Sequence, residues 1–384
     1  MDHLPRGLVV SVLAGSSMEV RPLKVVHVVE STATGTLSMV CLIANRLARE
    51  GHVVHIIYSI REDTPKNLRE LFDSRITLTR IQMNGSRSFK SIMELRAYFS
   101  RLDPDIVHLH SSFAGFIGRM ALLGMRSRST CFYSPHCISF MRRDISPMKK
   151  FAYVMLERIG CLKRATYIAC SESERDEIWR SLRQRATVVE NAVDVAALSQ
   201  PEAKENIQAN RRVVVTVGGI RTQKNPRLFA DIARRLIGRG LQFLWIGEGD
   251  AIFEKELREA GVEVTGWMSR QSVFERVRRS GIYLSTSSWE GMPVSVIEAM
   301  VVGTPPIVSS CAGNVDVVQH MHDGAIYTDA SEAAILITRI LDDRKLYADM
   351  ASHASSVARR RFSEDRFFAD LLTTYATAFA RRPV

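Results

Sequence analysis

The stretch "SSWEGMPVSVIEAMVVGTPPIVSS", residues 287–310, places two glutamates eight positions apart around a turn. It follows the strand-like run "GIYLSTS". Gly291 and Pro293 mark the turn into a helix that ends at Gly303, and a second turn leads into the strand-like run "PPIVSS". This order predicts neighbouring strands of a parallel sheet, with Glu290 at the carboxyl end of the first.

Open α/β sheets bind ligands at the carboxyl ends of their strands, so this turn is a candidate binding site. The free backbone N–H groups of Gly291, Met292 and Val294 are expected to point into the crevice, where they suit sugar hydroxyls or a phosphate. Glu298 lies farther along the same helix. Its carboxylate can accept two hydroxyl donors, which is what a ribose or hexose diol presents.

The rest of the chain repeats the same alternation of strands and helices. Runs such as "KVVHVVE", "HVVHIIYS" and "DIVHLHS", and later "VVVTVGG" and "LQFLWIGEGD", are continuously apolar, as parallel strands covered on both faces are. A chain of 384 residues exceeds the usual size of one core, so we expect two domains. The predicted boundaries are an N-terminal extension with little order (1–20), a first Rossmann-like domain (21–197), a linker (198–211), a second Rossmann-like domain (212–362) and a C-terminal helix that packs back toward the first domain (363–384).

The stretch "EGMPVSVIEAMVVGTPPIVSS" resembles the Glu-x7-Glu signature of the family 4 retaining glycosyltransferases, and the resemblance extends over nearly the whole chain. It implies an α/β protein of GT-B fold, with two doubly wound domains facing an interdomain cleft. In that family the first glutamate contacts the donor sugar and the second contacts the ribose of the nucleotide. Carried over, these residues are Glu290, as a catalytic residue, and Glu298.

The stretch "VTVGGIRTQKNPRLFADIA" resembles the family's loop that meets the donor diphosphate. Lys224 matches the family's lysine and is a predicted catalytic residue. Gly219 stands where the family has an arginine, so the pair of cations is incomplete. We take Arg221, two residues later, as the candidate replacement. Gly35, in "VVESTATGTLSMV", matches a loop glycine that lets the backbone approach the ligand.

Three histidines lie in stretches that resemble the acceptor side of the family, "DPDIVHLHSSFAGFIGRMAL" and "YSPHCISFMRR". His136 matches the active-site histidine and is the third predicted catalytic residue, although Cys137 replaces the usual glycine after it. His108 and His110 alternate along a strand and are interpreted as packed or hydrogen-bonded.

The sequence predicts neither a cofactor nor a metal. Six cysteines show no zinc spacing, and "WIGEGD" lacks the full dinucleotide-binding fingerprint. No Asp-x-Asp pair lies at the end of a strand, so cationic side chains and helix N-termini must offset the charge of the leaving diphosphate. The donor is therefore expected to be a nucleotide sugar bound without metal.

The positive charge is concentrated in the first half of the chain. The net charge is +11, and residues 1–200 contribute +9 of it. Ten basic residues but only two acids occupy the stretch 119–164. We interpret this stretch either as a solvated face or as a surface that docks peripherally on an anionic membrane leaflet. Nucleic acid is a poorer candidate and is not expected as a partner, because no helix-turn-helix, zinc or RNP pattern appears.

These observations predict a cytoplasmic, retaining hexosyltransferase bound to the inner face of the membrane. Its acceptor would be a lipid-linked glycan in bacterial surface polysaccharide assembly. Two alternatives remain: a UDP-sugar 2-epimerase of the same architecture, and a non-catalytic subunit that binds sugar nucleotides. Release of a free sugar isomer would indicate the epimerase. Turnover by the protein alone would exclude the subunit.

Overall fold

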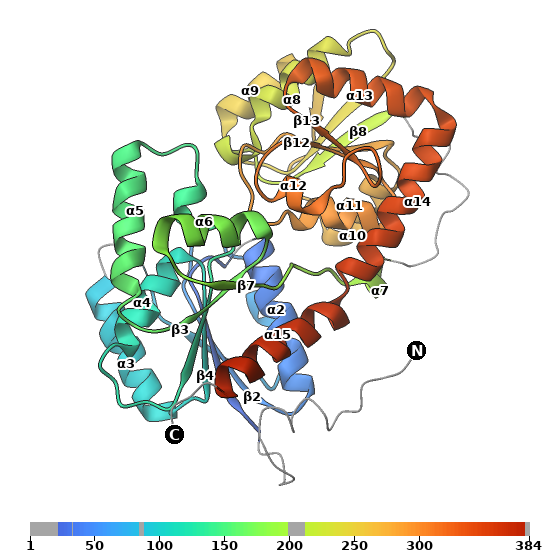
Figure 1. The fold of residues 1–384 in the computed structure, drawn as a ribbon. Coiled ribbons are helices and arrows are strands. Elements are labelled where there is room, and N and C mark those ends of the chain that lie inside the picture. The colour runs from blue at the N-terminus through green and yellow to red at the C-terminus, as the bar shows by residue number, and fades with distance from the viewer. Residues whose placement is uncertain (1–21, 33, 84–87, 199–211, 381–384) are drawn as a thin grey trace. The chain divides into compact units, whose positions relative to one another are not determined.

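The fold is described from a computed structural model of residues 22–32, 34–83, 88–198 and 212–380 (Figure 1). The predicted extension 1–20 and nearly all of the predicted linker 198–211 lie outside these residues. The chain forms two compact units. Unit 1 comprises the chain up to Met141, Ser146–Glu190 and the residues from Phe367 onward; unit 2 comprises Arg142–Ile145 and Asn191–Arg366.

Unit 1 contains a parallel sheet in the order β3-β2-β1-β4-β5-β6-β7. Its strands are β1 (Lys24–Val29), β2 (Val53–Tyr58), β3 (Thr77–Arg80), β4 (Ile106–His110), β5 (Thr130–Ser134), β6 (Thr166–Ala169) and β7 (Ala186–Val188). The apolar runs form these strands because both faces of the sheet are covered, and five of the six residues of β1 have no exposed surface.

Helices cover both faces of the first sheet (Figure 1). Apolar residues of α3 and α4 pack in one core with β1 and β4, while α2 and α15 lie on the other face. The helices of unit 1 are α2 (Thr34–Arg49), α3 (Ser88–Leu102), α4 (Ser112–Leu122), α5 (Pro147–Gly160), α6 (Glu172–Leu182) and α15 (Glu364–Ala380), with 3-10 turns η1 (Leu68–Leu71) and η3 (Ser139–Met141). From Phe367 onward, α15 belongs to unit 1, where the Tyr375 hydroxyl hydrogen-bonds His108 at 2.7 Å.

Unit 2 contains a second parallel sheet, in the order β10-β9-β8-β11-β12-β13. Its strands are β8 (Val213–Val217), β9 (Gln242–Ile246), β10 (Val262–Val264), β11 (Ile282–Ser285), β12 (Pro306–Ser309) and β13 (Ala325–Tyr327). Its helices are α7 (Val195–Leu198), α8 (Pro226–Arg235), α9 (Ala251–Glu259), α10 (Arg270–Arg278), α11 (Val294–Val301), α12 (Asn314–Val317), α13 (Ala330–Asp342) and α14 (Arg344–Arg361), with the 3-10 turn η5 (Thr222–Lys224).

The prediction of two doubly wound α/β domains is confirmed. Strands β3 and β13, which lie at the edges of their sheets, were not predicted from the sequence. Both are short: "TLTR" has four residues and "AIY" has three, so neither offers a continuous apolar run.

Each sheet has one point where the strand order reverses. It lies between β1 and β4 in unit 1, and between β8 and β11 in unit 2. Ligands of open α/β sheets bind outside the carboxyl ends of the strands at such points. The residues that follow these strands are therefore the ones to examine for function. Within the described part of the chain, no helix is long and apolar enough to cross a membrane.

Candidate functional site

The centre of the candidate site in unit 2 is an ion pair across the reversal point of the sheet. Lys224 follows β8 and Glu290 follows β11. The ammonium nitrogen of Lys224 lies 2.8 Å from Oε1 of Glu290. Only 15% of the lysine side chain and 10% of the glutamate side chain are exposed, so water screens this pair weakly.

Two further side chains hold the Glu290 carboxylate. The Ser287 hydroxyl donates to Oε1 at 2.8 Å, and the Gln223 amide donates to Oε2 at 3.2 Å. Gln223 also donates to the Trp289 carbonyl at 3.1 Å, which ties the loop after β8 to the loop after β11. A carboxylate with this many donors has one defined orientation, and the ammonium group of Lys224 retains N–H groups for a further acceptor.

Lys224 remains charged in this setting. Burial, the largest single cause, lowers the pKa of its ammonium group. Glu290 and Tyr283 together raise this pKa by more, so the net effect is a raised pKa. The positive charge of Arg221 acts in the opposite direction. Arg221 is itself exposed and begins the 3-10 turn η5 that carries Lys224. The two cations therefore lie within electrostatic range of each other, as a shared phosphate contact requires.

Gly219 has no steric reason to be glycine. A Cβ added there would meet only the Glu248 carbonyl oxygen, at 3.7 Å, which is ordinary van der Waals contact. Two glycines of the adjacent loop, in contrast, leave no room for a Cβ atom. A Cβ on Gly247 would lie 2.2 Å from the Gly218 carbonyl oxygen, and one on Gly249 would lie 2.2 Å from the Ile220 carbonyl oxygen. The glycines of "WIGEGD" therefore serve the close packing of two loops.

The turn after Glu290 is ordered as the sequence suggested. Helix α11 begins at Val294, and within the described residues the backbone N–H groups of Gly291, Met292 and Val294 have no hydrogen-bond partner. The Met292 side chain is buried, and its carbonyl accepts a hydrogen bond from Asn191 at 3.0 Å. Met292 therefore offers only its N–H group to a ligand.

Glu298 is paired with an arginine that sequence analysis did not identify. A guanidinium nitrogen of Arg270, at the start of α10, lies 3.3 Å from its carboxylate. Burial raises the pKa of Glu298 to about 7, and Arg270 opposes this effect only in part. Arg270 is 62% exposed, so it can move aside when a ligand binds. At neutral pH the Glu298 carboxyl group is thus close to its titration midpoint.

His136 lies in unit 1, in the loop after β5. Its Nε2 atom is 3.0 Å from Nδ1 of His110, the last residue of β4. Burial lowers the pKa of His136 to about 4, so the imidazole is neutral at physiological pH. His136 has a φ of 52° and Cys137 one of 80°, a backbone conformation that favours glycine. The usual family glycine at position 137 is consistent with this conformation.

The predicted position of Gly35 is wrong in one respect. Gly35 lies in the first turn of α2 (Thr34–Arg49), and not in the loop before it. The reason is that β1 ends at Val29, which leaves only four residues before the helix begins. Gly35 can therefore approach a ligand only as part of the helix N-terminus.

Three residues beside these sites were not predicted from the sequence. A Cβ on Gly313, whose φ is 85°, would lie 2.6 Å from Cβ of Glu290, so this glycine permits the position of the carboxylate. Ser111, after β4, has a φ of 75° and a buried hydroxyl without a hydrogen-bond partner among the described residues. Arg270 is the third. The only sequence signal was that Ser111 and Gly313 follow predicted strands.

Comparisons with known proteins agree with this geometry. The profile described as "Glycosyltransferase Family 4" matches residues 34–197, and that described as "Glycosyl transferases group 1" matches residues 200–357. The chain belongs to glycosyltransferase family 4.

Two relatives and one solved structure illustrate the similarity. The chain is 28% identical over 68% of its length to the UDP-Gal:alpha-D-GlcNAc-diphosphoundecaprenol alpha-1,3-galactosyltransferase of Escherichia coli, covering 72% of that protein. It is 24% identical over 93% of its length to an uncharacterized 41.2 kDa protein in the cps region of Klebsiella pneumoniae, covering 99% of it. Anabaena Alr3699/HepE, solved in complex with UDP and glucose, superposes with a TM-score of 0.78 at 16% identity, covering 92% of this chain and all of that one.

These similarities confirm the predicted family, the GT-B fold and the enzyme class. The chain is a glycosyltransferase of the hexosyltransferase class. The assignment of individual residues to donor and acceptor remains a prediction, which the contacts above make testable.

Proposed function

We propose that this family 4 glycosyltransferase moves a hexose from a nucleotide-sugar donor to a lipid-linked glycan in bacterial surface polysaccharide assembly, with retention of the anomeric configuration. The observation that carries the proposal is the Lys224–Glu290 pair at the reversal point of the second sheet. The galactosyltransferase relative, whose name specifies UDP-Gal and a diphosphoundecaprenol acceptor, indicates which substrates to try first.

The chemistry follows from charge and position. Departure of the nucleoside diphosphate leaves an oxocarbenium-like sugar and a diphosphate that gains negative charge. Lys224 is held by Glu290 and still has N–H groups to donate, so it can stabilise that charge together with the free N–H groups of Gly291 and Val294. Arg221 adds a second cation. The acceptor hydroxyl then bonds to the anomeric carbon from the face that the diphosphate leaves, and its proton passes to the departing diphosphate.

The two glutamates have different roles in this mechanism. Glu290, whose oxygens already accept three side-chain hydrogen bonds, is rigid and orients Lys224 and the sugar. Among the described residues, Glu298 is held only by the exposed guanidinium of Arg270, so its carboxylate is suited to accept hydrogen bonds from the two hydroxyl groups of the ribose. His136 would donate or accept a hydrogen bond at a substrate hydroxyl.

The donor is identified by thermal-shift screening of UDP-, GDP- and ADP-sugars against the purified protein. A bound donor stabilises the fold by mass action, so one base and one sugar should raise the melting temperature more than the others. We expect UDP-galactose to do so. The same titration with added EDTA should give an unchanged shift, because cationic side chains and N–H groups occupy the place of a metal in this mechanism.

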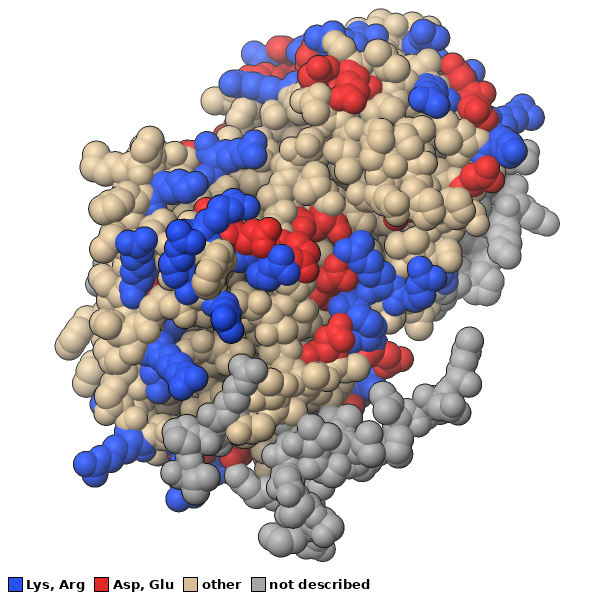
Figure 2. Space-filling view, viewed as in Figure 1, with Lys and Arg blue, Asp and Glu red and all other residues tan. Residues whose placement is uncertain are grey.

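We further propose that helix α5 docks the enzyme on an anionic membrane surface. Met148 is 80% exposed and Phe151 is 65% exposed, and Leu162, just after the helix, is 69% exposed. Lys149 and Lys150 lie between them. Figure 2 shows blue Lys and Arg side chains among tan residues over the region of α5, and red acidic side chains beside blue ones over the region of α6. Apolar side chains among cations suit an interfacial helix better than a solvated face.

One part of the basic stretch is not on the surface. Arg119, counted there by sequence, is completely buried and forms an ion pair with Glu157 at 2.6 Å. The Tyr133 hydroxyl donates to the same carboxylate at 2.7 Å, and Arg119 donates to the Tyr167 hydroxyl at 2.5 Å. Arg142 is paired with Asp144 at 2.6 Å. The charge available to a membrane is therefore smaller than the sequence count, and α5 itself contributes Lys149, Lys150 and Arg158.

A further inference from the structure

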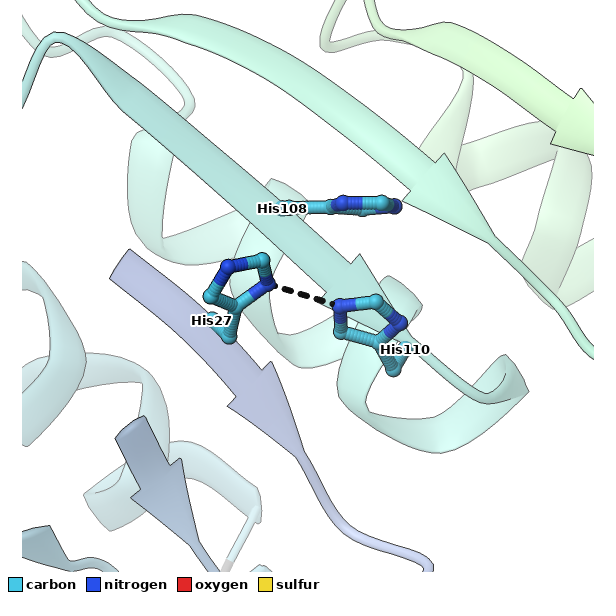
Figure 3. Close-up of side chains that lie close together, drawn as sticks. All are labelled: His27, His108 and His110. Atoms are coloured by element: carbon cyan, nitrogen blue, oxygen red, sulfur yellow. Dashed lines mark hydrogen bonds between the residues drawn. The ribbon is translucent and has the colours of Figure 1, made fainter. Parts of the chain in front are cut away.

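Three histidines form a continuous hydrogen-bonded chain across the first sheet. Nδ1 of His27, on β1, lies 3.0 Å from Nε2 of His110, on β4. Nδ1 of His110 lies 3.0 Å from Nε2 of His136, in the loop after β5. Figure 3 shows the first of these contacts, with His27 and His110 on adjacent strands. The chain thus connects the interior of unit 1 to the predicted active-site histidine.

The rings meet edge to edge, as an in-plane hydrogen bond requires. The ring centroids of His110 and His136 are 5.3 Å apart and the ring planes differ by 14°. Those of His27 and His110 are 5.2 Å apart. Each separation exceeds the N···N distance of 3.0 Å by about the width of one imidazole ring. The lone pair of one ring therefore faces the N–H group of the next.

All three imidazoles are neutral near pH 7. Burial lowers the pKa of His27 to about 3 and that of His136 to about 4. Burial, followed by the neighbouring imidazoles, keeps the pKa of His110 well below its usual value. Each ring then carries one N–H group, so the two hydrogen bonds can run in only two ways: both away from His27 or both toward it.

The inner end of the chain decides between these two directions. Nε2 of His27 is buried and has no hydrogen-bond partner among the described residues. If the bonds ran toward His27, that atom would carry a buried N–H group with no acceptor, which proteins rarely tolerate. If they run outward, His27 donates from Nδ1, His110 donates from Nδ1, and the Nε2 atom of His136 only accepts.

We propose that the buried chain from His27 through His110 fixes the tautomer of His136, so that its ring always presents an Nδ1–H donor to the substrate. His27 and His110 are then positioning residues. The tautomer part of this inference stands on unit 1 alone, whereas the effect on catalysis rests on the proposed role of His136. A histidine that keeps one tautomer suits recognition of a hydroxyl oxygen better than general base catalysis.

The loop that carries His136 is held independently of the hydrogen-bonded chain of histidines. The Glu174 carboxylate accepts hydrogen bonds from the backbone N–H groups of Cys137 at 2.7 Å, Ile138 at 2.9 Å and Cys170 at 2.9 Å. It thereby maintains the positive φ of His136 and Cys137. Because Glu174 fixes the backbone, the histidine chain is left to fix the ring and its proton.

His108 lies beside the chain of histidines but is not hydrogen-bonded to its members. Its Nδ1 atom pairs with the Tyr375 hydroxyl at 2.7 Å and its Nε2 atom with the Ser134 hydroxyl at 2.8 Å. Nitrogen atoms of His27, His108 and His110 lie within 4.8 Å of one another, a spacing that a metal ion can use. We favour hydrogen-bonded histidines over a metal site for two reasons. Most of these nitrogens are already paired. In addition, no carboxylate of the described residues joins the group to offset the charge of a buried dication.

The tautomers can be measured directly. We would label histidine with ¹⁵N and record long-range ¹H–¹⁵N spectra of the whole protein, without substrate, from pH 6 to 8. We expect His27, His110 and His136 to be neutral Nδ1–H tautomers throughout, although a free neutral histidine prefers Nε2–H. An Nε2–H signal for His136 would overturn the proposal. So would stoichiometric zinc, in the purified protein or after addition, that shifts the signals of His27, His108 and His110 together.

Variants at the inner end test the control of His136. His27→Leu removes the first donor, so the His136 signal should shift toward Nε2–H and turnover of UDP-galactose should fall about tenfold, the equivalent of one hydrogen bond. His27→Asn keeps an N–H donor near the position of Nδ1 and should restore both readouts. Circular dichroism establishes that each variant folds.

His55→Leu is the matched control, because His55 pairs only with Tyr98 at 2.8 Å among the hydrogen bonds of the described residues. It should leave the His136 tautomer unchanged. An unaltered His136 signal in folded His27→Leu would refute the inference. If the tautomers are as expected but the wild-type protein does not turn over any donor, the proposed function fails while the tautomer inference stands.

Discussion

The ammonium group of Lys224 lies 2.8 Å from the carboxylate of Glu290, although the two residues are 66 positions apart in the sequence. Each residue follows one of the two strands between which the order of the second sheet reverses, β8 and β11. The fold thus brings a cation and a carboxylate together at the point where such sheets bind ligands. Loss of either partner should therefore disturb the other.

Lys224→Ala should lower the turnover of the nucleotide-sugar donor by a factor of about 10² or more, because it removes a donor aimed at the developing phosphate charge. If Arg221 supplies the second cation, Arg221→Ala should cost a similar factor, measured as kcat. Arg239→Ala is a control for net charge, because it removes an exposed arginine of unit 2 that lies outside the loop of Arg221 and Lys224. This variant should leave the rate unchanged. Near-normal turnover in Arg221→Ala would leave Lys224 as the cation responsible.

Gly219→Arg should be tolerated and should raise the rate. A Cβ at this position meets nothing closer than 3.7 Å, so the variant should fold, and its guanidinium restores the cation that the family has there. Steady-state kinetics measures the rate, and thermal melting shows whether the variant folds. An unchanged rate in a folded variant would show that Arg221 already fills the role.

Glu298→Gln should weaken donor binding by about 1.5–3 kcal/mol, because it replaces charge-assisted hydrogen bonds to the ribose by neutral ones. Calorimetric titration with the donor measures this change. Glu275→Gln, on the neighbouring helix α10, is a matched control and should bind the donor normally. Equal affinity in wild type and Glu298→Gln would remove Glu298 from the donor site.

Donor affinity should also depend on pH through Glu298. Its pKa is raised to about 7, and the ribose binds the ionised form, so affinity should fall about tenfold between pH 8 and pH 6.

The free energy of unfolding should depend on pH in the opposite direction. The folded state holds this proton more tightly than the unfolded state, so this contribution to the free energy of unfolding is complete below about pH 4.5 and is lost as the pH rises to about 7. In Glu298→Gln both dependences should disappear; a persistent slope would assign them to another group.

Arg119→Met should lower the free energy of unfolding by about 3–5 kcal/mol, because it leaves the buried Glu157 carboxylate without its counter-ion. Urea denaturation gives the value. The double variant Arg119→Met with Glu157→Leu should recover much of the loss, since it removes both buried charges. A loss below 1 kcal/mol in the single variant would mean that the pair is accessible to water.

Binding to anionic vesicles should require both the charges and the apolar side chains of α5. Lys149→Gln with Lys150→Gln should make binding weak at all salt concentrations, and Met148→Ser with Phe151→Ser should weaken it even at low salt. Ile252→Ser with Lys255→Gln, which changes an exposed apolar residue and a lysine on α9, is the control and should bind like the wild type. Sedimentation with vesicles at several salt concentrations measures this; equal binding by all variants would assign the basic stretch to a solvated face.

Local sequence patterns were sufficient for the architecture, because continuous Val and Ile runs indicated parallel strands. Turn residues placed Glu290 after one strand, and the family resemblance singled out Lys224. The structure brings these two residues together, and their roles at the donor remain a prediction. The register between strands is not visible in this way. Only the pairing of β1 with β4, which sets His27 opposite His108, shows that histidines from distant parts of the chain meet.

Charge in a sequence does not report burial. Arg119 counted as one of ten surface cations, but it is enclosed by Tyr133, Tyr167 and Glu157, which are contributed by three later elements of the unit. Arg270 was missed for a related reason. Its partner, Glu298, lies 28 positions away on another helix, and no local pattern links them.

The central claim is tested most directly by the product of the purified enzyme. UDP-galactose, whose anomeric centre is α, is mixed with GlcNAc-diphosphoundecaprenol in vesicles, and the anomeric configuration of the new linkage is determined by NMR. We predict an α-linked galactose on the lipid, formed by the wild type and lost in Lys224→Ala. A β-linked product, or a rate that Lys224→Ala leaves unchanged, would contradict this account of the site.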